Sequence, residues 1–474
     1  MKRILNVILV FVIITWIHAL PAHSSEMEPL DENPAGLTLH EAISSALADN
    51  PQITSAGARV AAADQRIVQA RSGFLPRLYV SETYQRTTNP MWAFGTRLNQ
   101  GAITNEDFLP ERLNDPNAID NFATQVQMTW PVFDGGAAWF GRQQAGLALD
   151  AEKAGLERVR QEIIARTVSA YTNLILAIEN TTVVDQAMET ARAHHHLIEK
   201  RFEKGLAVKS DLLRIDVHIA ELEQHRISAR SHVAMARAAL NAVMGRDLHL
   251  AVSPLTSLGT PAGMDGTHPP LSDWIETALA KRPDIQQMVL REQMARAEIQ
   301  KSKSAHLPSV NLNGAYEINS ESFSDTADNY LVGASVTLNL FSGFQHSARA
   351  RETVHLHEEI KANLAGMKQQ VRLETEQAYF DLQSSQQRII FARTAVAQAE
   401  EALRIISDRY ESGLLPVVSL LDAELAVYRA KSMRLEALKE NMETHARLRL
   451  AAGTLDENFG QSWNGGPATH RSAR

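Results

Sequence analysis

The sequence predicts a mixed α+β membrane protein in which one unit, helix–strand–strand–long helix–helix, occurs twice. The first observation is an internal repeat at fixed spacings. The second is a pair of long proline-free segments with a seven-residue apolar period, which is typical of helices packed as coiled coils. The third is a set of segments of about ten residues that alternate apolar and small polar side chains, as the strands of a membrane β-barrel do.

The repeat is carried by matching motifs. Pro51 and Pro76 recur as Pro283 and Pro308, 232 residues later, and WPVFDGG and RFEKGL recur as NLFSGF and RYESGL after 208 residues. The two spacings differ because the first copy carries a 24-residue insertion between its two strands. Agreement at so many fixed offsets indicates a duplicated architecture, so we expect one body with internal pseudo-symmetry.

Each half has the same order of elements. An opening helix ends before a proline, two strands follow, and a long helix then runs to a glycine turn from which a second helix returns. The first repeat, 37–250, is expected to contain an opening helix at about 39–72 broken near Pro51, strands at about 77–85 and 122–133, a long helix at 137–203 and a return helix at 209–245. The second repeat, 271–453, is expected to contain an opening helix at about 271–304, strands at about 309–318 and 330–341, a long helix at 345–411 and a return helix at 417–452.

Two further segments are expected to be irregular. Residues 251–270 form a Pro/Gly-rich linker between the repeats, and residues 454–474 form a polar, mobile C-terminal tail. The insertion at 86–121 is expected to be a loop between the first two strands, at the exterior end of a barrel.

The N-terminus has the features of a cleaved secretion signal over residues 1–25. Lys2 and Arg3 precede an apolar run, and small residues follow Pro21. An uncleaved membrane anchor is the alternative. No other stretch approaches 18 apolar residues, so the mature chain is expected to lack a transmembrane helix.

Composition narrows the classes of partner and site. The net charge of −8 gives no basic footprint, which argues against nucleic acid as a partner. The chain has no cysteine, which excludes disulfides, thiolate metal sites, a catalytic thiol and a lipid anchor on an N-terminal cysteine.

Four predicted strands are too few to close a barrel by themselves. The smallest membrane barrels have about eight strands, and open strand edges cannot lie in lipid. If the strands span a membrane, we therefore expect the chain to oligomerise, although the period does not fix the number of subunits. A soluble sheet with one buried face would show the same alternation and remains the alternative.

The order of motifs resembles the TolC-type outer-membrane efflux proteins. The resemblance extends from about Leu37 to Gly453 and is carried by LTLHEAISSALADNPQI, QARSGFLPRL, WPVFDGG, RFEKGLAVKSDLL and RYESGLLPVVSLLDAE. It implies a homotrimer in which each chain gives four strands to a 12-stranded β-barrel, continued by a periplasmic α-helical coiled-coil barrel. It also implies docking onto a periplasmic adaptor (membrane fusion) protein and an inner-membrane pump.

The expected function is therefore that of an outer-membrane channel, the exit duct of a tripartite efflux or type I secretion system. The exported material would be small molecules, drugs, metal ions or proteins. The alternative is a non-channel periplasmic coiled-coil protein with a structural or adaptor-like role.

The resemblance also assigns a periplasmic gate near the glycine turns. Asp422 occupies a gate-aspartate position, and three copies near an axis would attract cations. Tyr410 and Asp211 match positions whose hydrogen bond would hold the tip shut. Ser419 and Leu415 stand where some members carry an aspartate and a latching arginine, so the polar latches of those members are weakened here.

Helix capping is a local alternative for some of these side chains. Ser419 and Asp422 have the spacing of a capping box, and Ser210 or Asp211 could cap the first return helix. By the resemblance, Ser210 and Asp211 instead bond to the second-half turn.

The turns themselves are candidate docking points for the adaptor. Gly205-Leu206 and Gly413-Leu414 combine a residue that permits chain reversal with a small apolar anchor. The alternative is that both leucines pack beneath their turns.

Histidines are the remaining cluster. Three are consecutive from His194, and His218, His225 and His232 recur every seven residues on the return helix, so His194 could face His218. HExxH and similar spacings are missing from the sequence, and we expect solvated or packed histidines rather than a metal site. Nucleophile elbows, P-loops and dinucleotide motifs are missing too, so the sequence predicts neither an enzyme nor a bound cofactor.

Overall fold

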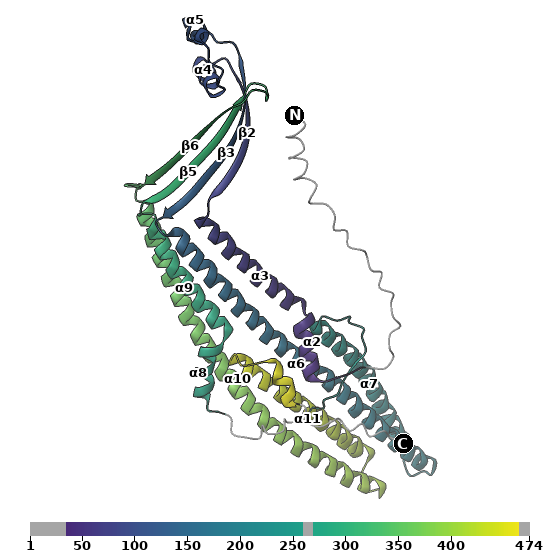
Figure 1. The fold of residues 1–474 in the computed structure, drawn as a ribbon. Helices are drawn as coiled ribbons and strands as arrows, with labels where there is room; N and C mark the ends of the chain where they lie inside the picture. Colours follow the sequence, from purple (N-terminus) through teal and green to yellow (C-terminus); the bar gives the residue numbers. More distant parts are fainter. Residues whose placement is uncertain (1–34, 259–268, 464–474) are drawn as a thin grey trace. The chain divides into compact units, whose positions relative to one another are not determined.

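A computed structural model describes residues 35–258 and 269–463 of the chain (Figure 1). The expected signal peptide, 1–25, lies outside these residues. The chain divides into two compact units. The strand unit comprises residues 64–146 and 294–358, and the helical unit comprises the remaining described residues.

The strand unit is built on one antiparallel sheet of four long strands, in the order β2-β3-β5-β6 (Figure 1). The strands are β2 (Arg77–Thr87), β3 (Ile119–Asp134), β5 (Ser309–Ser320) and β6 (Ala327–Thr337). The sequence repeat thus meets in the middle of the sheet, where β3 of the first half pairs with β5 of the second. Strands β2 and β6 form its two edges.

The register of the sheet gathers the apolar side chains on one face. In one row across the strands Val80, Val126, Tyr316 and Tyr330 pair in turn, whereas the next row, Ser81, Gln125, Glu317 and Asn329, lies on the opposite face. Val80 and Tyr330 are 74% and 79% exposed in the single chain. The sheet therefore presents an apolar face and a polar face, and neither is a protein core within one copy of the chain.

The insertion at 86–121 connects β2 to β3, as expected, and part of it has regular structure. It contains α4 (Pro90–Asn99), a 3-10 turn (Asn105–Phe108) and α5 (Pro110–Asn114). Pro90 and Pro110 occupy the first positions of the two helices, where a missing N–H has no cost. The Asn89 side chain caps α4 by accepting from the N–H groups of Met91 and Trp92, and Arg97 forms an ion pair with Asp107.

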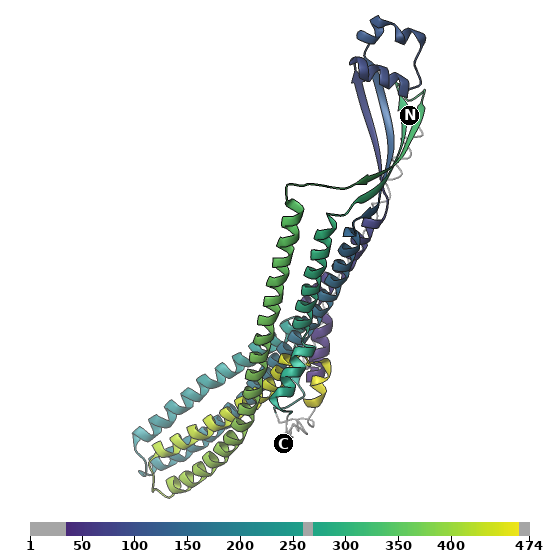
Figure 2. The same ribbon diagram turned by 90° about the vertical axis from the view of Figure 1, so that its left-hand side faces the viewer.

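The helical unit contains two long helical hairpins and the helices that open each half (Figure 2). The helices are α2 (Leu39–Asp49), α3 (Pro51–Arg71), α6 (Ala137–Glu203), α7 (Lys209–Met244), α8 (Leu271–Lys281), α9 (Pro283–Ser304), α10 (Gln345–Glu411) and α11 (Val417–Ala451). Four of them, α3, α6, α9 and α10, have residues in both units. Helices α6 and α10 have 67 residues each, so each is about 100 Å long. Among the described residues, no helix combines the length and apolarity needed to cross a membrane.

In both halves of the sequence, a residue just after the return helix packs against the break in the opening helix. Each return helix is followed by a glycine in the left-handed conformation, Gly245 (φ 72°) or Gly453 (φ 69°). Gly453 packs against the backbone of Arg282, between α8 and α9, and Gly245 packs against the backbone of Asp49 and Asn50, at the break between α2 and α3. Both contacts are so close that neither glycine position has room for a Cβ. The ends of the return helices therefore pack against the breaks that prolines introduce into the opening helices.

Arg282 adds an ion pair to the second of these seats. Its buried guanidinium lies 2.6 Å from a carboxylate oxygen of Asp284 and 2.6 Å from one of Glu374 on α10. Burial raises the pKa of Asp284, but the hydrogen bonds and charge of Arg282 outweigh burial and lower it. Asp284 therefore stays ionised in the folded protein, as a buried arginine requires.

The segment after α11 differs from the expected mobile tail over residues 454–463. Residues Glu457–Trp463 form a 3-10 helix, η4, and Phe459 and Trp463 are buried in the main core with Leu39 and Ile43 of α2. Two large aromatic side chains four residues apart hold this polar segment in place by burying their rings. A short parallel pairing of β1 (Ala35–Leu37) with β4 (Val252–Pro254), from the predicted linker, lies in the same unit.

Replacing Gly453 should test the shared contact. Gly453→Ala forces a Cβ to 2.7 Å from the Cα of Arg282 in addition to the left-handed strain, so we expect a loss of more than about 2 kcal/mol. Gly413→Ala is the matched control, because Gly413 has a similar φ of 73° but open space around it; its loss should be about 1 kcal/mol. Thermal melts and limited proteolysis would measure both, and equal losses would contradict the packing account.

Candidate functional site

The two hairpins, α6–α7 and α10–α11, share one apolar core near their turns. In Figure 2 the teal and the yellow-green hairpins lie side by side with their turns at the same end. All four helices contribute buried side chains, so the turn region is a single packed body. We call this set the turn core: Met188, Ala191 and Ile198 of α6, Ile215 and Leu222 of α7, Tyr410 of α10, and Val417 and Leu420 of α11.

The two turns have the same backbone geometry. The N–H of Gly205 donates to the carbonyl of Phe202 and that of Leu206 to the carbonyl of Arg201, at 2.9 and 2.8 Å. Gly413 and Leu414 repeat the pattern on α10. This is a Schellman motif, which ends a helix through a left-handed glycine.

The turn leucines are exposed in the single chain. Leu206 and Leu414 are 74% and 73% exposed. The alternative that they pack beneath their own turns is therefore wrong. Each leucine projects beside its turn and is open to contact with another molecule.

Arg201 joins the two turns and is not among the residues singled out from the sequence. Its guanidinium donates to the carbonyls of Tyr410, at 2.8 Å, and Glu411, and its Cζ lies 5.0 Å from the centre of the Tyr410 ring. A cation at the C-terminal carbonyls of α10 satisfies groups that have no partner within the helix. The available signal was a basic residue in the last turn of α6, in RFEKGL, but sequence does not say which helix such an arginine reaches.

Tyr410 is buried in the turn core, but the expected hydrogen bond to Asp211 is not found among the described residues. Burial raises the pKa of Tyr410; the charge of Arg201 lowers it, and the charge of Asp211 raises it. Asp211 is therefore close enough to act through its charge, but Arg201 is the direct partner. The expected hydrogen bond between Tyr410 and Asp211 is therefore corrected to a contact between Tyr410 and Arg201.

The capping alternative is also wrong. Helix α7 starts at Lys209 after Val208, and α11 starts at Val417 after Pro416, and neither start has a side-chain cap. Ser210, Asp211 and Ser419 lie within the first helical turns instead. At this position the negative charge of Asp211 interacts favourably with the positive, N-terminal end of the α7 helix dipole.

The remaining gate candidates lie on or near the start of α11. Asp422 is exposed on α11, while Ser419 and Leu415 are partly buried. The structure thus brings Tyr410 into the turn core, and leaves Asp422 free to face whatever lies outside a single chain.

Several of the histidines near the turns pair with carboxylates. No group of three or more His, Asp or Glu side chains with the arrangement of a metal site occurs in the part of the chain that the structure describes. His195 pairs with Asp216 of α7 at 3.1 Å. His194 and His218 do come together, as the spacing predicts, and both contact Glu424.

Removing the Arg201 side chain should loosen the turns. Arg201→Gln loses two hydrogen bonds from a charged donor, each worth about 1.5–3 kcal/mol, so we expect amide exchange over residues 405–414 to be several-fold faster. Lys200→Gln, an exposed neighbour on α6, is the control and should leave exchange unchanged. Hydrogen–deuterium exchange with mass spectrometry would decide, and unaltered exchange in Arg201→Gln would refute the bridge.

Comparison with known proteins identifies the family. The model of the family described as outer membrane efflux protein matches residues 42–246 and 274–454. The chain is 26% identical over 439 residues to the alkaline protease secretion protein AprF of Pseudomonas aeruginosa, covering 90% of this chain and 87% of that protein. It is 22% identical over 429 residues to the outer membrane protein TolC of Escherichia coli, covering 86% and 80%.

A solved structure has the same fold. The Campylobacter jejuni CmeC outer membrane channel matches with a TM-score of 0.73 at 16% identity, and the match covers 92% of this chain and 91% of that one. Its mostly helical architecture with a few strands agrees with the elements described above. Since the family model matches most of the sequence, the chain belongs to the outer membrane efflux protein family.

Proposed function

We propose that three copies of the chain form the exit duct of a tripartite efflux or type I secretion system in the outer membrane. Each copy would supply four strands to a 12-stranded barrel and two hairpins to a periplasmic helical tube. The observation that carries this proposal is the four-stranded sheet, which has an apolar face along its whole width and two unpaired edges.

The sheet edges supply the physical argument. Every second backbone N–H and C=O of β2 and β6 points away from the sheet, and each such group left unpaired in hydrocarbon costs several kcal/mol. Pairing β2 of one copy with β6 of the next satisfies both edges at once. The apolar face would then meet lipid and the polar face would line a water-filled lumen.

The family supports the partners in this proposal. An exit duct requires a periplasmic adaptor protein and an inner-membrane pump to load it, and we assign docking to the exposed leucines of the two turns. The similar protein AprF is named for protease secretion, so secreted proteins belong among the substrates to test, along with drugs, metal ions and other small molecules.

The turn region is our candidate for the periplasmic gate. The turn core packs the hairpins together, and Arg201 ties the end of α6 to the end of α10. With three copies around an axis, the exposed Asp422 side chains would form an acidic ring. Ser419 and Leu415 would contribute little charge to that ring, and Ser210 and Asp211 would flank it from the first hairpin.

The non-channel alternative is less consistent with the sheet. A periplasmic coiled-coil protein in water would gain nothing from a wide apolar face on long strands, because such patches promote association and aggregation. The same face is what a barrel wall needs. No step in the proposed role requires catalysis or a cofactor.

Neutralising Asp422 tests the gate. In planar bilayers we expect Asp422→Ala to lower the preference for cations several-fold, because an acidic ring is lost. Asp408→Ala removes the same charge from the exposed face of α10 and is the control. Unchanged selectivity and closure in Asp422→Ala would place the gate elsewhere, and a wild-type protein that forms no pores would contradict the exit duct itself.

Charging the turn leucines tests docking. Leu206→Asp and Leu414→Asp put a carboxylate where we place an apolar anchor, so crosslinking to the adaptor in cells should fall at least tenfold. Val217→Asp is the matched control, because Val217 is an exposed apolar residue of α7 away from the turns. Wild-type crosslinking by the double leucine variant would show that docking lies at another surface.

A further inference from the structure

We infer that His194, His218 and Glu424 form a proton-sensitive clasp that fastens the first hairpin to the second next to the proposed gate. Its effect on the channel rests on the proposed function, whereas its effect on the hairpins does not. His194 lies on α6, His218 on α7 and Glu424 on α11. The clasp therefore joins three helices and both hairpins.

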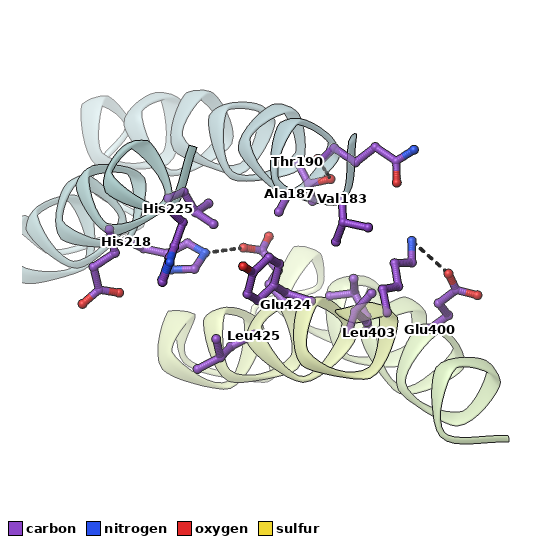
Figure 3. Close-up of a pocket in the computed structure, with 15 residues that line it drawn as sticks. Val183, Ala187, Thr190, His218, His225, Glu400, Leu403, Glu424 and Leu425 are labelled. Atoms are coloured by element: carbon purple, nitrogen blue, oxygen red, sulfur yellow. Dashed lines mark hydrogen bonds and ion pairs between the residues drawn. The ribbon is translucent and has the colours of Figure 1, made fainter. Parts of the chain in front are cut away.

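The contacts are direct and largely buried. His194 Nε2 lies 3.1 Å from Glu424 Oε1, and His218 Nε2 lies 3.3 Å from Glu424 Oε2. The side chains of His194, His218 and Glu424 are only 14%, 13% and 7% exposed. Figure 3 shows His218 and Glu424 reaching toward each other from α7 and α11.

Glu424 is an unusual residue for its position on α11. It occurs in a buried stripe with Val417, Leu420 and Val427, all apolar. A buried carboxylate costs several kcal/mol unless cations or donors compensate it. Neither carboxylate oxygen of Glu424 has a hydrogen-bond partner among the described residues. Compensation must therefore come from the charge of the two imidazoles at ion-pair distance, which belong to the opposite hairpin.

Proton uptake changes the strength of the contacts. A neutral imidazole can present either an N–H or a lone pair at Nε2, and a lone pair repels a carboxylate oxygen. An imidazolium donates from both nitrogens, and its charge-assisted bond is about twice as strong as a neutral one. Histidine changes its charge between about pH 5 and 8, so the clasp should tighten as pH falls through this range.

Charged and titratable groups from three helices lie beside the clasp. From α7, Glu221 and His225 line the adjoining cavity; from α10, Glu400; and from α11, Lys431 and Tyr428; α6 contributes only uncharged groups (Figure 3). Lys431 pairs with Glu400 at 3.0 Å, which cancels one positive and one negative charge. Glu221 adds a further acidic side chain to the cavity wall.

The cavity gives protons a route to the clasp. Its volume is about 170 Å³, and His218 and Glu424 lie in its wall. Its wall is largely apolar but includes the polar groups of Thr190, His218 and Glu424, and a space of this size has room for water molecules beside them. The clasp can therefore exchange protons without unfolding of the hairpins.

The clasp occurs once in each chain. The positions that correspond to His194 and His218 in the second repeat, 208 residues later, are Ala402 and Ala426. The duplicated scaffold thus carries an asymmetric lock, with both bases on the first hairpin and the acid on the second. In the channel, acidification should hold the turns together and favour closure.

Hydrogen exchange on the full-length protein in detergent tests the clasp directly. After correction for the pH dependence of the chemical rate, we expect residues 212–224 and 418–430 of the wild type to be several-fold better protected at pH 5.5 than at pH 8. Glu424→Gln and the His194→Gln/His218→Gln double variant should lose this difference. Glu424→Leu completes the apolar stripe, so it should fold stably and also lack the difference.

The matched control is His195→Gln. His195 pairs with Asp216 inside the first hairpin, so its loss should leave the pH-dependent protection of α11 intact. The inference is overturned if the Glu424 variants keep the wild-type pH dependence, if His195→Gln abolishes it, or if a chelator of divalent metals removes it from the wild type.

Bilayer recordings separate the clasp from the channel. Wild-type pores should close more often at pH 5.5 than at pH 8, and Glu424→Leu pores should not respond. If the wild type forms no pores, the exit duct is refuted while the exchange data still decide on the clasp. If pores form and their closure ignores pH in the wild type, the clasp does not act on the gate.

Discussion

The two unpaired edges of the four-stranded sheet are the constraint on which the proposed assembly depends. Strand backbones need partners for every N–H and C=O, and neither lipid nor a single copy of this chain supplies them at β2 and β6. A ring of copies removes the edges, and the apolar face that the register builds then becomes the outer wall of a barrel. In the proposed assembly, the need to oligomerise follows from backbone chemistry rather than from a side-chain interface.

The helical unit anchors its two hairpins through a contact that both halves of the sequence share. Each half needs a long hairpin anchored at a fixed place, and both halves achieve this by seating a left-handed glycine on a proline-directed helix break. The repeat differs where the hairpins meet. Arg201 crosses from one turn to the other, and Glu424 receives two histidines from the first hairpin. The glycine contacts, which both halves share, anchor the hairpins. The contacts of Arg201 and Glu424 join one hairpin to the other, and they are the ones that we propose to change.

Much of the fold is readable from the sequence because its signals are local. Alternation marks the strands, the seven-residue period marks the long helices, and Gly205 and Gly413 mark the turns. The sequence fails to predict the structure where contacts between residues far apart in the chain determine it. Phe459 and Trp463 order a polar tail only because α2 offers them a core, and the reach of Arg201 depends on which helix lies next to it. Glu424 was visible as a carboxylate in an apolar stripe, but its partners lie on another hairpin.

Closure of the sheet edges between copies is the central claim, and crosslinking tests it most directly. The chain has no native cysteine, so cysteines placed at Ser81 of β2 and Ser335 of β6, both on the polar face, would report only edge pairing. Neighbouring positions on each edge would scan the register. The account predicts that oxidised outer membranes yield a covalent trimer as the largest product, because the ring closes at three. Monomers at every register, or a ladder that continues beyond trimer, would contradict it.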